Sequence, residues 1–156
     1  MVRLDEALRK HGLLMPNPPA KGGMYEPAKD FGENFCYLSG CTPSFNGEAK
    51  WRGKLGAQIS LEEGQQAAKL CALNLLANIQ AAYGSLERVK RIAKMLVLVA
   101  GTDTFYEQPK VANGASELLV DIFGEEIGLC ARSAIGVNAL PGNAPVEIEL
   151  LIELKP

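Results

Sequence analysis

The stretch CARSAIGVNALPGNAPVEIELL, residues 130–151, holds the pattern that decides the fold. It predicts two β-strands joined by a loop rich in turn-forming residues. The first strand is small and apolar apart from Arg132, and the second is apolar apart from Glu147 and Glu149. Charged side chains are rarely buried unless they are paired or used, so these three residues are the first candidates for a functional site.

Alternation along the two strands assigns their side chains to faces. Glu147 and Glu149 point to one face of the second strand, and we expect its branched residues to pack under helices on the other face. We also expect Arg132, Ala134 and Gly136 to share the open face with the glutamates, where the two small residues leave room for a ligand. Spacing alone also fits a salt bridge between subunits, or solvated charges on an edge strand.

Upstream of this stretch, the sequence predicts the rest of one sheet and two long helices. A strand over 34–39 is followed by an Asn46-Gly47 turn and a return strand over 49–54. The later elements are a helix from the Ser60–Glu63 capping box to Gly84, a strand over 92–100 and a helix over 109–123 ended by Gly124. The order β-β-α-β-α-β-β predicts an α+β fold, with a single mixed sheet and two long helices on one face.

The continuous apolar run from Ile92 to Ala100 has a consequence for assembly. Such a run is typical of a central strand that is buried on both faces. The two predicted helices cover only one face, and the sequence predicts no further helix of comparable size. We therefore expect another subunit to cover the open face, which would put any residue on that face at a subunit boundary.

The N-terminal segment is expected to lie outside the sheet. Residues 4–14 predict a short amphipathic helix ending near Gly12, with His11 as an exposed surface residue. Residues 15–30, with their prolines and glycines, predict an extended leader. Residues 1–16 are thus expected to be a helical extension of a single domain that spans residues 1–156.

Composition narrows the classes of function. The net charge of −2 gives nucleic acid no overall attraction, so no nucleic-acid partner is expected. No run reaches the ~18 apolar residues that span a bilayer, and no signal peptide is evident, so no membrane contact is expected. The four scattered cysteines read as buried free thiols, which favours a cytoplasmic location. A single histidine argues against histidine triads, zinc sites built on histidine pairs and histidine-dependent ribonuclease chemistry.

Several motifs together resemble one known family. The segments ARSAIGV (131–137), LP (140–141) and VEIE (146–149) resemble the C-terminal signature of the Rid/YjgF family of reactive-intermediate deaminases, also called endoribonuclease L-PSP-like proteins. Further pieces agree in order along the chain: Tyr25 after Gly23, Ser39-Gly40, Glu63-Gly64-Gln65 and Asn113. The resemblance covers residues 22–154, nearly the whole chain.

The resemblance implies a chorismate mutase-like fold and a homotrimer with clefts between subunits. The deaminating members of the family hydrolyse 2-imino (enamine) acids to 2-keto acids and ammonia, without metal or cofactor. The roles it implies are a carboxylate clamp for Arg132, activation of the hydrolytic water for Glu147, and substrate contacts for Tyr25, Ser39, Gly40, Asn113, Ser133 and Ala134. Glu149 is left with a supporting or salt-bridging role.

This chain departs from the family pattern in three places. Ala134 stands where the best-known deaminases have a cysteine, and Cys41 follows Ser39-Gly40 where a glutamine is commoner. The N-terminal extension marks a different branch. Two alternatives to an imine deaminase therefore stay open: a non-catalytic protein that binds a small carboxylate, such as a 2-keto acid, and an endoribonuclease.

Overall fold

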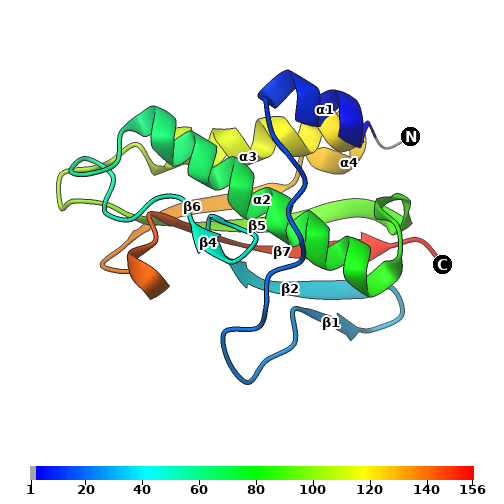
Figure 1. The fold of residues 1–156 in the computed structure, drawn as a ribbon. Coiled ribbons are helices and arrows are strands. Elements are labelled where there is room, and N and C mark those ends of the chain that lie inside the picture. Colours follow the sequence, from blue (N-terminus) through cyan, green and yellow to red (C-terminus); the bar gives the residue numbers. More distant parts are fainter. Residues whose placement is uncertain (1–2) are drawn as a thin grey trace.

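Five strands form one mixed sheet, and helices cover one of its faces (Figure 1). The computed structural model describes residues 3–156. In space the strands run in the order β1-β2-β7-β5-β6; β5 and β6 are parallel, and the other neighbours are antiparallel. Their bounds are β1 Ala28–Phe31, β2 Phe35–Cys41, β5 Val89–Ala100, β6 Ala131–Val137 and β7 Val146–Leu154. The predicted fold class is confirmed, and the sheet strands and the two long helices follow the order β-β-α-β-α-β-β, although one of the first two strands lies at other residues than predicted.

The two long helices begin and end where the sequence predicts. α2 (Leu61–Tyr83) starts at a complete capping box, in which Ser60 and Glu63 each accept a backbone hydrogen bond from the other, at 3.2 and 2.8 Å. α3 (Gln108–Phe123) packs directly on α2. The two backbones meet at Gly114, where any Cβ would collide with the carbonyl of Gln65. Glycine is therefore required for the helices to lie this close.

The core lies between these helices and the sheet. β7 alternates buried and half-buried residues along its whole length. Its buried residues, which face the helices, are Val146, Ile148, Leu150, Ile152 and Leu154. The predicted face assignment of this strand is confirmed, and it leaves Glu147 and Glu149 on the open face.

One predicted strand is absent from the sheet, and its place is taken by β1, which begins inside the predicted leader over residues 15–30. The Asn46-Gly47 turn is present, with φ of 51° and 86°, but it joins two-residue strands, β3 (Ser44–Phe45) and β4 (Glu48–Ala49), in a separate small sheet. The return strand over 49–54 was wrong. Both edges of β2 are occupied, one by β7 and the other by β1, so a strand after the turn has no edge to join.

The N-terminal helix is present as α1 (Leu4–His11), ended by Gly12 in the left-handed conformation. It packs on α3, where Asp121 accepts hydrogen bonds from Lys10 at 2.8 Å and from His11 at 2.7 Å. His11 is therefore not an exposed residue: its side chain is 9% exposed. Residues 1 and 2 of the predicted extension lie outside the described part of the chain. The short helices η1 (Leu86–Arg88), α4 (Glu125–Gly128) and η2 (Pro141–Asn143) were not predicted.

Within the described part of a single chain, no helix covers the opposite face of the sheet (Figure 1). Apolar side chains lie on this open face: Leu96 and Leu98 on β5 and Leu151 on β7 are half-buried, while Tyr37 and Ile135 are 46% and 47% exposed. The central strand β5 is thus apolar on both faces, as the run from Ile92 to Ala100 predicted.

Candidate functional site

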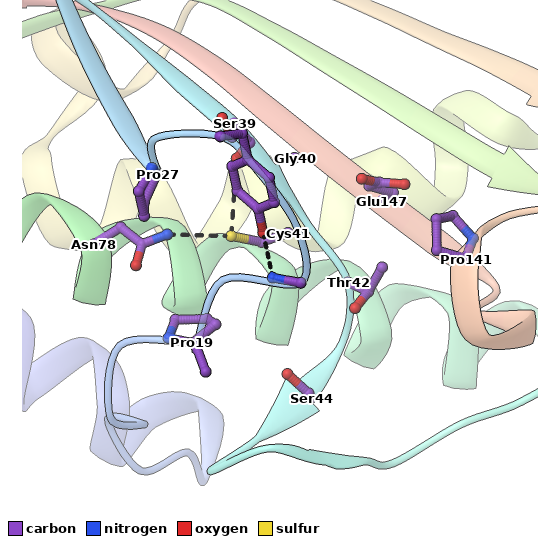
Figure 2. Close-up of a pocket in the computed structure, with 13 residues that line it drawn as sticks. Pro19, Pro27, Ser39, Gly40, Cys41, Thr42, Ser44, Asn78, Pro141 and Glu147 are labelled. Atoms are coloured by element: carbon purple, nitrogen blue, oxygen red, sulfur yellow. Dashed lines mark hydrogen bonds between the residues drawn. The ribbon is translucent and has the colours of Figure 1, made fainter.

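A cavity of about 450 Å³ opens at the edge of the sheet, beside the end of β2. Its walls come from the leader, the end of β2 with the turn after it, and β7 with the loop before it (Figure 2). α2 contributes Asn78. The volume lies in the range of small-molecule sites, and we call this region the Glu147 cavity.

The cavity exists because two strands end at different points. β1 stops opposite Leu38, whereas β2 continues to Cys41. Leu38 pairs with Leu150 and Cys41 with Ile148, so β2 carries one more residue than β7 in this interval. This β-bulge interrupts the ladder next to the cavity, as bulges beside active sites often do.

Ser39 fastens the leader over the bulge. Its backbone N–H donates to the carbonyl of Pro27 at 3.0 Å, and its hydroxyl donates to the carbonyl of Glu26 at 2.7 Å. Tyr25 follows the same leader into the cavity wall, where its hydroxyl accepts a hydrogen bond from the N–H of Gly22 at 3.1 Å. The leader therefore takes the place that β1 leaves, and brings Tyr25 to the site.

Glu147 is the charged residue of this cavity. Its side chain is half-buried on the open face, and no hydrogen bond or ion pair joins its carboxylate to any residue between 3 and 156. Burial raises the pKa of Glu147, and the nearby charge of Glu149 raises it further. A carboxylate with a raised pKa is a stronger proton acceptor, which is the property a general base requires.

Gly40 sets the position of that carboxylate. A Cβ on Gly40 would overlap Oε1 of Glu147, so only glycine leaves space for the carboxylate to lie against β2. The predicted pair Ser39-Gly40 thus has two separate tasks, since one residue holds the leader and the other makes room for Glu147.

Arg132 lies at the other end of the sheet, between the edge strand β6 and α3. Its guanidinium donates to Oδ1 of Asn113 at 2.9 Å and to the hydroxyl of Ser116 at 3.0 Å, and more distantly to the carbonyl of Pro109 at 3.4 Å. All three acceptors are neutral, so the positive charge is oriented without being neutralised. Such a fork suits a carboxylate ligand. We call this region the Arg132 edge.

The prediction that Arg132 shares a face with the glutamates is wrong. Arg132 is paired with Met95, which is fully buried under the helices, whereas Glu147 is on the opposite face and two strands away. The assumption that branched residues face the helices failed on β6, where Ile135 is exposed on the open face. The reason is that the helix face above this edge strand is polar, because α3 presents Asn113 and Ser116 there.

The remaining predicted site residues divide between the two regions. Asn113 and Ala134 belong to the Arg132 edge, with Ala134 packed against the core. Ser133 points to the open face, where its hydroxyl accepts a hydrogen bond from Nζ of Lys94 at 2.6 Å. Tyr25, Ser39, Gly40 and Glu147 all line the Glu147 cavity. The structure therefore brings the predicted residues together as two groups on one chain.

Glu149 does not line the cavity. Its carboxylate accepts a hydrogen bond from the hydroxyl of Tyr37 at 2.6 Å, and this bond raises the pKa of Tyr37. Glu149 acts on Glu147 only through its negative charge. Two roles were predicted for Glu149, to support the site or to form a salt bridge. These contacts fit the supporting role better.

The sequence analysis missed the inner wall of the cavity, formed by Cys41, Thr42, Ser44 and Asn78. Burial raises the pKa of Cys41 to about 12, with the nearby charge of Glu147 contributing, so its thiol stays neutral. A neutral, buried thiol is a poor nucleophile. The signal for this wall was in the sequence: Asn74 and Asn78, four residues apart, interrupt the otherwise apolar run from Leu70 to Ile79.

Two further findings concern residues 3–156. They contain no group of three or more histidine, cysteine, aspartate or glutamate side chains arranged to hold a metal ion. Their helices include none with the length and apolar character needed to cross a bilayer.

Comparisons with known proteins agree with this architecture. The family model described as "YjgF/chorismate_mutase-like, putative endoribonuclease" matches residues 5–154. Protein TCP17 of Trypanosoma cruzi is 40% identical over 97% of this chain and 94% of its own length.

Two solved structures are also similar. The protein Atu1372 of Agrobacterium tumefaciens, of unknown function, shares 36% identity at a TM-score of 0.90, over 97% of this chain and 92% of its own. A "putative endoribonuclease" of Shewanella oneidensis shares 33% identity at a TM-score of 0.89, over 96% of this chain and 98% of its own. With a family model that matches nearly its whole length and relatives of this similarity, the chain belongs to the YjgF/chorismate mutase-like family.

Proposed function

We propose that this protein hydrolyses reactive 2-imino acids, and their enamine tautomers, to 2-keto acids and ammonia. One observation carries the proposal: a carboxylate and a guanidinium both lack an oppositely charged partner among residues 3–156. Glu147 lies in a cavity, and its pKa is raised by burial. The guanidinium of Arg132 is oriented by neutral acceptors only. These are the two groups that an imine with an adjacent carboxylate needs.

The two groups face opposite sides of the sheet, so a second copy of the chain would complete the site. The half-buried and exposed apolar side chains of the open face favour burial against another subunit. A homotrimer that closes in this way would bring the Arg132 edge of one subunit to the Glu147 cavity of the next. Each cleft would then hold one carboxylate and one guanidinium.

The reaction in such a cleft needs orientation and a base. The guanidinium of Arg132 would bind both oxygens of the substrate carboxylate and hold the C=N carbon near Glu147. Glu147 would take a proton from a water molecule as its oxygen attacks the carbon of the protonated imine, giving a neutral tetrahedral carbinolamine. Glu147 would then return that proton to nitrogen and take the hydroxyl proton as the C–N bond breaks, which releases ammonia and leaves the 2-keto acid. Orientation and general-base catalysis are each worth orders of magnitude in rate.

An endoribonuclease fits these side chains less well. The protein's one histidine, His11, is on α1 and is bonded to Asp121, so the cavity contains no imidazole. The charged group that the cavity does contain is a carboxylate, which repels a phosphate backbone. A non-catalytic carboxylate-binding protein remains the second candidate, because the Arg132 edge alone accounts for binding.

Ammonia release from freshly generated 2-iminobutanoate tests the proposal. Glu147→Gln should lower the rate by ~10²-fold or more while the protein still binds 2-oxobutanoate, because the carboxylate clamp is intact. Arg132→Ala should lose both binding and turnover. The matched control is Glu153→Gln, on the same face of β7, where Glu153 instead pairs with Lys90 and Arg91.

Each alternative has its own result. Wild-type protein that binds 2-oxobutanoate but never accelerates ammonia release would identify a binding protein. RNA cleavage that survives the loss of both Arg132 and Glu147 would contradict the assignment of this site.

A further inference from the structure

The Glu147 cavity continues past the reacting end of the site. Glu147 and Pro141 lie at one end of the group of side chains in Figure 2, and Asn78 of α2 lies at the other, with Cys41 between them. The cavity thus passes around the end of β1, from the open face of the sheet toward the helix side. Its volume of about 450 Å³ leaves room for a substrate side chain beyond the imine and carboxylate groups.

Asn78 is unusual among the residues of this core. Only two polar side chains between residues 3 and 156 are buried, Asn74 at 1% and Asn78 at 6% exposed. The Nδ2 of Asn78 donates to the sulfur of Cys41 at 3.5 Å, which is a weak bond, and its Oδ1 accepts no hydrogen bond from the described residues. Oδ1 of Asn78 is accessible from the cavity, unlike Oδ1 of Asn74, which is fully buried without a partner in the described residues, so a ligand or water in the cavity can reach Asn78.

Asn74, one turn earlier on the same helix, shows what a structural asparagine does here. Its Nδ2 donates to the carbonyls of Thr42 at 3.0 Å and Ser44 at 2.8 Å, and so fixes the turn that forms the cavity wall. Asn74 does not line the cavity, whereas Asn78 does. The two amides therefore differ: Nδ2 of Asn74 fixes the turn while its Oδ1 is buried without a partner in the described residues, whereas the fold gives Asn78 only the weak contact with Cys41.

We propose that Asn78 determines specificity by hydrogen-bonding a neutral polar group, best a carboxamide, at the far end of the substrate side chain. This inference rests on the proposed function, because it assigns the substrate class of the same site. Oδ1 accepts a hydrogen bond from the ligand amide, and Nδ2 leaves the thiol to donate to the ligand carbonyl. A carboxamide satisfies both atoms of Asn78 at once, which a hydroxyl does only in part.

A negatively charged substrate side chain is unfavourable in this cavity. Cys41 is neutral, Thr42 and Ser44 carry only hydroxyl groups, and Glu147 repels a second carboxylate. An alkyl side chain fits the space but leaves the Asn78 amide unpaired after water is displaced. Sites built to hydrogen-bond a ligand reject analogues that lack the bonding group for this reason.

Asparagine and leucine, whose side chains have nearly the same shape, provide the test. Their imines are generated with an amino acid oxidase and compared by kcat/KM for ammonia release. The two amino acids themselves, and aspartate, are stable probes of binding by isothermal titration calorimetry. We expect wild-type protein to prefer the carboxamide over the isopropyl side chain by roughly tenfold in both measurements, and to reject aspartate.

The variants remove one amide at a time. Asn78→Leu should abolish or reverse the preference for asparagine over leucine. Asn78→Ala, which removes the amide without adding bulk, keeps the test valid if the leucine variant does not fold. Gln66→Ala, at an exposed amide of α2 outside the cavity, should leave the preference unchanged.

The outcomes separate this inference from the proposed function. If ammonia release is fast but the two side chains are treated alike, or if Asn78→Leu keeps the preference, the role of Asn78 is wrong and the deaminase stands. If asparagine binds through Asn78 but no imine is hydrolysed faster, the role of Asn78 stands and the deaminase is wrong. If neither ligand binds and neither imine reacts faster, both are wrong.

Discussion

The Glu147 cavity and the Arg132 edge are built in opposite ways. The cavity is enclosed by four segments of the chain, and its charged group, Glu147, makes no hydrogen bond to the described protein. The Arg132 edge is open, and its guanidinium is held at three points by one helix. Enclosure raises the pKa of the carboxylate and so favours proton transfer, whereas multiple neutral contacts fix a cation for binding. The two regions are suited to different steps of the proposed reaction, and one chain does not bring them together.

The largest effect on activity is expected when Arg132 and Glu147 are substituted on different subunits of one trimer. Arg132→Ala and Glu147→Gln are each expected to be inactive alone. In trimers assembled from an equal mixture, about a quarter of the clefts should pair an intact Arg132 with an intact Glu147. Refolding or subunit exchange of the mixture should therefore restore about a quarter of wild-type ammonia release.

Complementation requires assembly, so the mass of the wild-type protein in solution is measured alongside it by light scattering. A monomer, or a mixture that remains inactive although mixed oligomers form, would show that the two regions do not share one cleft.

A smaller loss is expected from Gly40→Ala, which alters the cavity alone. The added methyl group overlaps Oε1 of Glu147, and because that carboxylate is the end of a flexible side chain, it will move with little cost in stability. We expect kcat to fall by about tenfold or more, while the melting temperature and the binding of 2-oxobutanoate at the Arg132 edge change little.

Gly22→Ala is the matched control for this change. A Cβ on Gly22 also lines the cavity but meets only the Tyr25 hydroxyl, at an ordinary 3.9 Å. Equal losses in the two variants would indicate that cavity volume matters more than the position of Glu147.

The smallest effect concerns stability. The pKa of Glu147 in the folded protein is raised above its ordinary value of 4.5, so the ionised carboxylate destabilises the fold once the pH rises through the raised pKa. Glu147→Gln should therefore raise the melting temperature by roughly 1–3 °C at pH 7–8. The difference should disappear below pH 4.5, where the folded and unfolded forms are both protonated. A difference that grows as the pH falls would contradict the burial of this carboxylate.

Local sequence patterns determined most of the architecture. The Ser60–Glu63 capping box, the apolar run that ends at Ala100 and the alternation along residues 146–151 each specify an element through contacts within a few residues, and all three are confirmed. The resemblance to a known family then gave the fold class, because its motifs lie in order along nearly the whole chain. Glu147 and Gly40 were also identified at this level, although the reason for Gly40 was not.

Tertiary structure alone decided which surfaces meet. Strand alternation states which residues share a face but not which face lies under a helix, so Arg132 was assigned to the wrong side. The pairing of β1 with β2, and the bulge that opens the cavity, depend on which strand edges remain free after the sheet has assembled. Asn78 becomes part of the cavity wall only when α2 packs across the end of β2. Each of these features is a contact between distant segments, and a chain specifies such contacts through packing of the whole fold and not through any local pattern.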